Sequence, residues 1–383
     1  MNSWCFIEML RTTKIRIYPT REQAEFLEAQ FGAVRFAYNK ALHIKTYFYK
    51  KKNISLSLKK EIKPLLSLGK KSRKYSWLSQ FDSISLQQSI INLDKAFSNF
   101  FNPKIKAKFP KFKRKHGYQS SYHCTGLKIL ENAIKIPKCK PIKAKIHREI
   151  SGTLKSITIS KSSTGKFYAS ILVDCGNEAP AKPKHITKIS GFDLGLTDFL
   201  ISDKGEKIAN PRFLINAYKN LRRKQKALSR CTKGSKNRAK ARLLLAKAHE
   251  RVANARNDFQ HQLSKRIIDE NQAIIVETIK SSNMLKNKRL AKHIADAAWG
   301  AFVSKLAYKA DMYGKWLIKC DQWLPSSKTC SCCGYKMDKM LLHIRVWTCP
   351  SCNEVHCRDT NSGKNLRNAG LIELKAAGLT VSA

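Results

Sequence analysis

Apolar and polar residues alternate over residues 13–18, where Lys14 and Arg16 alternate with Ile15 and Ile17. This period of two predicts a half-exposed β-strand. Thr20 follows, with Gln23 three positions later, and this capping-box spacing predicts that a helix begins directly after Thr20. An apolar stripe at helical spacing continues along the same segment through Leu27, Phe31, Val34, Tyr38 and Leu42.

Two further segments have a helical pattern: residues 56–66, which Pro64 interrupts, and residues 86–101. We therefore expect a helical bundle inserted after the first strand. From residue 120 to residue 174 the pattern changes to short alternating segments, and a turn centred on Gly165 predicts a hairpin. These strands are expected to form a small β-barrel with the first one. The proline-containing residues 177–187 predict a linker.

The second half of the chain has the pattern of a mixed sheet covered by helices. Strands are expected over residues 189–194, on both sides of a turn at residues 203–205, over residues 273–276 and over residues 316–321. Helices are expected over residues 221–229, 237–269, 296–313 and 360–377. An antiparallel meander with an acid in its first strand is typical of an RNase H-like sheet. The fold class is therefore multidomain, combining α+β and α/β parts.

The charge balance indicates the kind of partner. The chain has 74 Lys and Arg residues against 27 Asp and Glu residues, a net charge of +47. Such a positive field favours a polyanion, because binding releases the counterions condensed on it. No run of about 18 apolar residues is present, so no membrane-spanning helix is expected. Nucleic acid is the expected partner, not a membrane, and the first residues lack a signal-peptide core, so we expect a cytoplasmic protein.

Four of the twelve cysteines form a metal-binding pattern. Cys330 and Cys333 form one C-x2-C pair, Cys349 and Cys352 a second, and fifteen residues separate the pairs. This spacing predicts a structural zinc site, because four thiolates leave no open coordination position. We expect His343, His356 and Cys357 not to be ligands, and Trp347 to pack between the two pairs.

Three acids predict a second metal centre. Asp193 lies in the strand over residues 189–194. Glu277 directly follows the apolar run over residues 273–276, and Asp359 begins the last helix. Acids at the ends of parallel strands converge at one sheet edge, where they could hold two Mg²⁺ ions for phosphodiester hydrolysis. Each also has a structural interpretation: a turn residue for Asp193, an arginine pair for Glu277, and a helix N-cap for Asp359.

Residues 104–115 alternate basic residues with Phe109 and Phe112. The segment could grip phosphates while the aromatic rings stack on bases, or it could be a solvated linker. The basic residues concerned are Lys104, Lys106, Lys108, Lys111, Lys113, Arg114 and Lys115.

From about Met9 to its end the chain resembles the TnpB (OrfB) family of insertion-sequence proteins, relatives of the type V CRISPR effector nucleases. The segments that carry the resemblance are MLRTTKIRIYPTREQ, FGAVRFAYN, NLDKAFSNFF, KFPKFKRK, GFDLGLTDF, NPRFL, IIVETI, KRLAKHIADAAWGAF, SSKTCSCCG and RVWTCPSCNEVHCRDTNSGKNL.

The resemblance implies a wedge β-barrel with an inserted helical domain, then a RuvC-type nuclease domain with an inserted zinc ribbon. The expected parts are residues 9–19 as the first barrel strand, 20–103 as the helical recognition domain, 104–179 as the rest of the barrel, 186–327 as the nuclease domain, 328–355 as the ribbon and 356–383 as the last part of the nuclease domain.

The implied activity is RNA-guided cleavage of double-stranded DNA, with a guide RNA transcribed from the end of the element. By this resemblance, Asp193 matches the first family acid in G-x-D-x-G, Glu277 the second and Asp359 the third in R-D-x-N, with Mg²⁺ as cofactor. The family motif usually has Asp where this chain has Cys357. It has two alanines where this chain has Ser362 and Gly363, and the glycine weakens a helix by up to about 1 kcal/mol.

Two other functions remain open at this point. A transposase or resolvase would act directly on element ends, but no end-binding module or catalytic tyrosine motif is apparent. A nuclease-inactive, RNA-guided repressor would be favoured by the loss of one acid, and all three acids are present.

Overall fold

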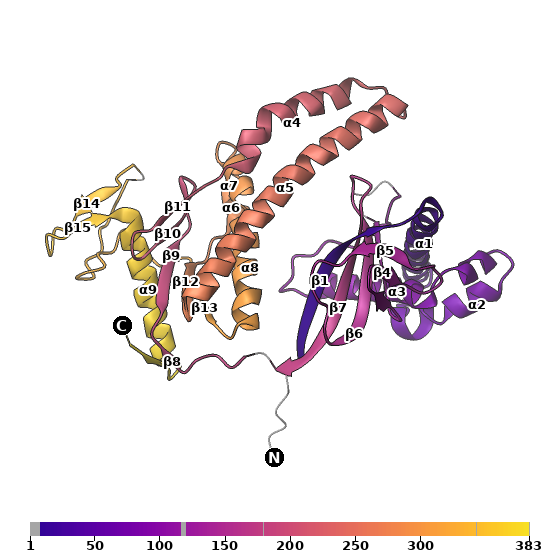
Figure 1. The fold of residues 1–383 in the computed structure, drawn as a ribbon, viewed down its shortest axis with the longest axis horizontal. Coiled ribbons are helices and arrows are strands. Elements are labelled where there is room, and N and C mark those ends of the chain that lie inside the picture. Colours follow the sequence, from indigo (N-terminus) through magenta and orange to yellow (C-terminus); the bar gives the residue numbers. More distant parts are fainter. Residues whose placement is uncertain (1–7, 116–119, 179, 342, 383) are drawn as a thin grey trace, which may run out of the picture. The chain divides into compact units, whose positions relative to one another are not determined.

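A computed structural model describes residues 8–115, 120–178, 180–341 and 343–382. It divides into two compact units, Met1–Asn177 and Glu178–Ala383, which are described separately (Figure 1). We expected the first residues not to form a signal peptide, and residues 1–7 lie outside the described part of the chain. Among the described helices, none has the length and apolarity needed to cross a membrane.

The first unit contains a sheet of seven strands in the order β2-β6-β7-β1-β5-β4-β3. Ile15 and Ile17 are buried in β1, which lies between β7 and β5, so the first strand does join the later ones. The sheet is a half-barrel with β2 and β3 at its ends. Its strands are β1 (Glu8–Tyr18), β2 (Ser120–Cys124), β3 (Lys128–Leu130), β4 (Ala133–Lys135), β5 (Ile142–Lys145), β6 (Thr153–Lys161) and β7 (Phe167–Glu178). The hairpin expected around Gly165 is the β6–β7 connection.

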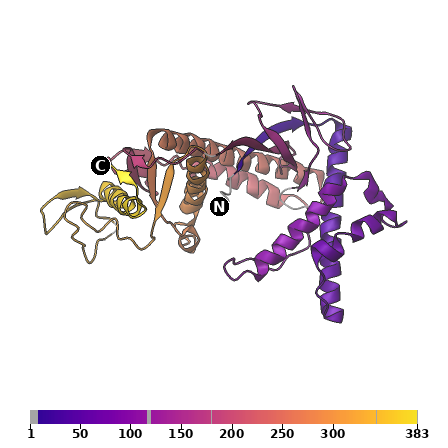
Figure 2. The same cartoon turned by 90° about the horizontal axis from the view of Figure 1, so that it is seen from below.

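Helices inserted between β1 and β2 form the rest of this unit. The capping box is confirmed: the Gln23 amide donates to Thr20 Oγ1 (3.3 Å), and the Thr20 amide donates to Gln23 Oε1 (3.0 Å). The helices are α1 (Arg21–Lys52), the π-helix η1 (Leu58–Ile62), α2 (Leu65–Lys71), the 3₁₀ helix η2 (Ser76–Gln80) and α3 (Ser83–Phe101). Figure 2 shows α1 and α3, which pack through Leu42, Ile90 and Leu93.

A five-stranded sheet organises the second unit in the order β11-β10-β9-β12-β13. Its strands are β9 (Ile189–Asp193), β10 (Asp198–Ser202), β11 (Lys207–Ala209), β12 (Ala273–Glu277) and β13 (Trp316–Cys320). The first three form the expected antiparallel meander, and β12 is parallel to both β9 and β13. The strands expected in this half are therefore confirmed.

Helices cover both faces of this sheet. On one face, Phe192, Ile274 and Val276 pack against α5 (Lys236–Glu270) and α8 (Trp299–Met312). On the other, Ile189 and Ile275 pack against α9 (Arg358–Ala376). The contact between α9 and β9 is close enough to require glycine: a Cβ on Gly191 would collide with the carbonyl oxygen of Gly363, and one on Gly363 would lie 2.8 Å from the Asp203 nitrogen.

Two helix boundaries and one linker differ from the expectations. The expected helix over residues 296–313 is broken at Ala298 (φ 51°) into α7 (Ala291–Ala297) and α8. The helix expected from residue 221 is α4 (Phe213–Arg230), which begins eight residues earlier. The expected linker ends in a short strand, β8 (His185–Ile186), parallel to β16 (Thr380–Val381). The remaining elements are α6 (Ser281–Met284), β14 (Val346–Thr348) and β15 (Val355–Cys357).

Candidate active site and metal centre

Asp193 and Glu277 lie at the carboxyl ends of two adjacent parallel strands. The register pairs Val276 of β12 with Phe192 of β9, so the two acids follow at the same sheet edge. The Leu194 amide donates a hydrogen bond to Glu277 Oε1 (3.1 Å), which ties one strand end to the other. The parallel pairing of β9 with β12 thus places both carboxylates together, as expected for strand-end acids.

Burial and mutual repulsion disfavour two negative charges at this edge. Burial, and then the charge of Asp193, raise the pKa of Glu277 to about 8. Burial, opposed by a hydrogen bond from Ser362 Oγ (2.9 Å), and the charge of Asp359 raise the pKa of Asp193 to about 6, while the charges of Arg358 and Arg345 act to lower it. Within the described residues neither Asp193 nor Glu277 forms an ion pair with Lys or Arg. The pair is therefore a site where a divalent cation would relieve repulsion.

Asp359 lies in the first turn of α9, on the helix that packs against β9. Its carboxylate forms an ion pair with Arg345 (3.1 Å). It is close enough to Asp193 to raise that residue's pKa. Among the described residues, only the four cysteines form a group whose potential ligand atoms all lie within 4.8 Å of one another. The carboxylate oxygens of the three acids are therefore farther apart than this. A cation bound by Asp359 would compete with Arg345.

The four cysteine sulfurs form a compact cluster. Cys330 Sγ lies 3.6 Å from Cys352 Sγ, and Cys333 Sγ lies 3.6 Å from Cys349 Sγ. A tetrahedral zinc ion with bonds of about 2.3 Å to sulfur would hold its ligands about 3.8 Å apart. The donor set and spacing therefore fit zinc, and all four predicted ligands are brought together.

Neighbouring side chains support this cluster without joining it. His356 is buried, and its Nε2 lies 3.0 Å from Cys330 Sγ, within hydrogen-bonding distance. Trp347 is buried against the His356 ring (centroids 4.8 Å apart), as expected for a residue packed between the pairs. The ligand group of four cysteine sulfurs found among the described residues does not include His343, His356 or Cys357.

Comparison with known proteins identifies the family. A family described as "Probable transposase" matches residues 170–288, a "Cas12f1-like, TNB domain" matches residues 299–366, and a "Helix-turn-helix domain" matches residues 9–53. The chain is 36% identical to a "Putative RNA-guided DNA endonuclease" of Streptomyces pristinaespiralis, over 95% of this chain and 90% of that protein. The chain belongs to the TnpB (OrfB) family.

Two further comparisons agree with this membership. The chain is 26% identical to "Putative RNA-guided DNA endonuclease InsQ" of Escherichia coli (strain K12), over 95% of this chain and 93% of that protein. A solved structure of a Cas12f1–sgRNA–target DNA complex has a similar fold, with a TM-score of 0.57 at 14% identity, covering 95% of this chain and 99% of that one. In this TnpB-family chain, the residues that match the "Helix-turn-helix domain", 9–53, form β1 and one helix, α1.

Two other buried acids of this TnpB-family chain have structural partners. Asp296 accepts hydrogen bonds from the Leu214 and Ile215 amides (2.9 and 3.2 Å) and pairs with Arg256 (3.0 Å). Asp203 accepts from the Gly191 amide (3.2 Å), and its charge is also neutralised by an arginine. Burial of a carboxylate therefore does not by itself mark a site; Asp193 and Glu277 differ in being only partly buried and in forming no ion pair among the described residues.

The basic segment over residues 104–115 is anchored to α1. Asn39 Nδ2 donates to the Lys113 carbonyl (2.9 Å), and the Lys113 amide donates back to Asn39 Oδ1 (2.8 Å). Lys113 Nζ lies 4.1 Å from the centre of the Tyr38 ring. Phe109 packs edge-on against Phe97 and Phe100, whereas Phe112 is 56% exposed. The segment has a defined backbone path, which distinguishes it from a freely solvated linker.

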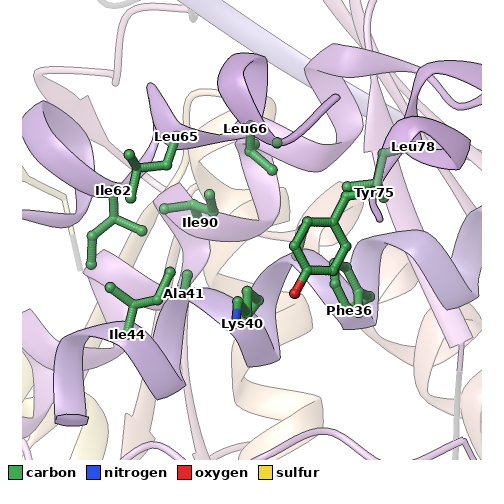
Figure 3. Close-up of a pocket in the computed structure, with 12 residues that line it drawn as sticks. Phe36, Lys40, Ala41, Ile44, Ile62, Leu65, Leu66, Tyr75, Leu78 and Ile90 are labelled. Carbon is green, nitrogen blue, oxygen red and sulfur yellow. The ribbon is translucent and has the colours of Figure 1, made fainter. Parts of the chain in front are cut away.

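Figure 3 shows an apolar hollow of about 180 Å³ in the helical part of the first unit. Phe36, Ile44, Leu66 and Tyr75 are among its lining residues, and Lys40 is the one charged residue that lines it. None of the described residues that line it carries a carboxylate or a thiol, so they offer no ligand set for a metal ion.

Proposed function

We propose that this chain is an RNA-guided DNA endonuclease whose RuvC-like site consists of Asp193, Glu277 and Asp359. The observation that carries the proposal is a pair of partly buried carboxylates, neither in an ion pair among the described residues, at the ends of adjacent parallel strands in a chain of charge +47. The names of the curated relatives support the reaction class.

The three acids would hold Mg²⁺, which suits hard oxygen donors. When bound, Mg²⁺ activates water and stabilises the leaving oxygen of a phosphodiester. The chain's own contribution is placement. Parallel pairing of β9 with β12 fixes Asp193 and Glu277, the Leu194 amide orients the Glu277 carboxylate, and the packing of α9 on β9 brings Asp359 to the same edge.

The proposed domains follow the predicted boundaries. The sheet order β11-β10-β9-β12-β13 supports an RNase H-like, RuvC-type domain over residues 186–327 and 356–383. The cysteine cluster supports a zinc ribbon over residues 328–355. The half-barrel with its inserted helices supports a wedge domain, residues 9–19 and 104–179, and a recognition domain, residues 20–103.

Two basic surfaces are proposed to bind guide RNA and DNA. One is the anchored segment over residues 104–115. The other is the α4–α5 hairpin, where residues 213–251 have thirteen Lys and Arg residues against one Glu (Figure 1). Dense positive charge of this kind drives polyanion binding through counterion release.

The proposal is tested with purified protein, RNA from the element end and a matched plasmid in Mg²⁺. We expect guide-dependent cleavage of both DNA strands, and no cleavage of a plasmid lacking the matched sequence. Guide-dependent binding without cleavage would favour the repressor, and joining of element ends without RNA would favour the transposase. Either of these two results would contradict the proposal.

Cation binding at the acids is expected to strengthen as pH rises from about 6 to about 8. The pKa of Glu277 is raised to about 8 and that of Asp193 to about 6, so protons compete with the cation in this range. Binding of Mn²⁺ at pH 7 should release about one proton per chain, since Glu277 is then mostly protonated. Calorimetry in buffers of different ionisation enthalpy measures this release. Glu277→Gln should remove it; release that persists in this variant would contradict the assignment.

The sign of the stability effect follows from the same raised pKa values. The folded state holds protons that the unfolded state has already lost, so the metal-free protein should lose stability as pH rises from about 4.5 to about 8. Mg²⁺ should restore stability most strongly at the upper end of this range.

Replacing Lys104, Lys106 and Lys108 by Gln is expected to weaken RNA binding and to reduce its salt dependence. Each phosphate that is no longer neutralised should lower the slope of log K against log salt by about 1. The matched control replaces Lys50, Lys51 and Lys52 at the end of α1, which are also exposed and change the net charge equally. RNA binding is measured from about 50 to about 300 mM salt, a range in which the Debye length falls from about 14 to about 6 Å. The slopes of the two variants are then compared. Equal effects in both variants would show that the segment acts only through net charge.

A further inference from the structure

The first two turns of α9 bind the loop that carries the first zinc-ligand pair. The side-chain amides of Asn361 and Asn365 both donate to the Thr329 carbonyl (2.7 and 2.6 Å). Asn365 also donates to the Ser326 carbonyl (2.8 Å), and Asn361 Oδ1 accepts from the Ser331 amide (2.9 Å). The loop on both sides of Cys330 is therefore fixed to the helix that carries Asp359.

Ser362 lies between these two asparagines and connects the same loop to Asp193. Its Oγ is 2.9 Å from Asp193 Oδ1 and 2.9 Å from Ser326 Oγ. Ser362 Oγ is placed as the donor toward both oxygens, so its one hydroxyl proton is shared between the loop and the acid. The hydroxyl therefore links Ser326 of the ribbon loop directly to Asp193, and Ser362 is 1% exposed.

We propose that Ser362 is a positioning residue that couples the folded ribbon to cation binding at Asp193. The inference rests on the proposed function, since it takes Asp193 as a cation ligand. Metal-bound cysteines fix the loop, the fixed loop positions Ser326 Oγ, and the Ser362 hydroxyl between Ser326 and Asp193 holds the carboxylate in one orientation.

The coupling must act in both directions, because two linked binding equilibria change each other by the same factor. A zinc-loaded ribbon should strengthen cation binding at the acids, and a bound cation should slow the loss of zinc.

The first test measures Mn²⁺ binding by electron paramagnetic resonance, because Mn²⁺ prefers oxygen ligands and leaves the thiolate site to zinc. Zinc-loaded wild type is compared with the zinc-free variant Cys349→Ser. We expect binding about tenfold weaker without zinc, the usual effect of losing an outer-shell partner. Ser362→Ala should weaken Mn²⁺ binding to the zinc-loaded protein by a similar factor. The double variant, Ser362→Ala with Cys349→Ser, should bind Mn²⁺ no more weakly than either single variant.

The second test measures zinc release during thiol modification. Saturating Mn²⁺ should slow release in wild type and in Ser362→Thr, which keeps the hydroxyl, but not in Ser362→Ala. Ser326→Ala, which leaves α9 unchanged, should behave as Ser362→Ala does and replaces it if that variant fails to fold. Zinc release that Mn²⁺ slows equally in all variants would overturn the proposal.

These measurements need neither RNA nor DNA, so they separate the two proposals. Equal Mn²⁺ affinity with and without zinc would contradict the coupling alone. Failure to cleave matched DNA, together with zinc-dependent Mn²⁺ binding, would contradict the proposed function alone.

Discussion

Asp193→Asn is expected to reduce guide-dependent DNA cleavage by about 10³-fold or more, because metal assistance contributes several kcal/mol and each 1.36 kcal/mol is about tenfold in rate. The amide keeps the shape of the side chain and can still accept from Ser362, so the fold should persist. Removing a buried charge beside Glu277 should leave the stability of the metal-free protein unchanged or higher. Single-turnover cleavage, guide RNA binding and thermal unfolding are measured on the same preparation.

The matched control is Glu206→Gln, which removes one negative charge from an exposed carboxylate that pairs with Arg266 near the same sheet. It should cleave at nearly the parental rate. Cleavage by Asp193→Asn within tenfold of wild type would contradict the assignment of this acid.

Cys349→Ser is expected to abolish zinc binding. Cys349 is fully buried in the cluster, and structural zinc contributes about 10–16 kcal/mol of apparent binding free energy, which folds small metal modules. Zinc content should fall from one ion per chain to a trace. Hydrogen exchange should become fast across β14 and β15, while β9 and β12 remain protected, because those strands belong to a separate hydrophobic core.

Cys332→Ser provides the control within the same ribbon, since Cys332 is exposed and outside the ligand group. It should retain the zinc ion and the exchange pattern. A Cys349→Ser protein that still binds one zinc ion per chain would contradict the four-cysteine site.

Strand and helix patterns were sufficient to predict the elements that carry the site. The strands expected over residues 189–194 and 273–276 are β9 and β12, so Asp193 and Glu277 could be placed at strand ends before their contacts were known. Cysteine spacing alone predicted the cluster, because C-x2-C pairs are local. The short strand β8 was missed because its pairing partner, β16, lies almost two hundred residues later.

The helix boundaries were missed for a long-range reason. α4 begins at Phe213 without a local capping side chain, because Asp296, far along the sequence, accepts from the Leu214 and Ile215 amides. Nothing near residue 213 signals this start. The break at Ala298 is equally hidden, since alanine ordinarily favours a helix, and the side chain that donates to the carbonyls at the break belongs to Gln260, almost forty residues earlier.

Ser362 and Gly363 show how a sequence interpretation can reverse. As departures from a family motif they suggested a weakened helix. In the structure Gly363 lies where a Cβ would be 2.8 Å from the Asp203 nitrogen, and Ser362 donates to Asp193. The ion pair between Arg345 and Asp359 was also not predictable, because it depends on how the ribbon lies against α9.

The most direct test of the three-acid site is an anomalous difference map from crystals of the protein soaked in Mn²⁺. We predict density between the carboxylates of Asp193 and Glu277, with Asp359 released from Arg345 and turned toward the same ions. Mn²⁺ bound elsewhere, with Asp193 and Glu277 left free of metal, would contradict the account.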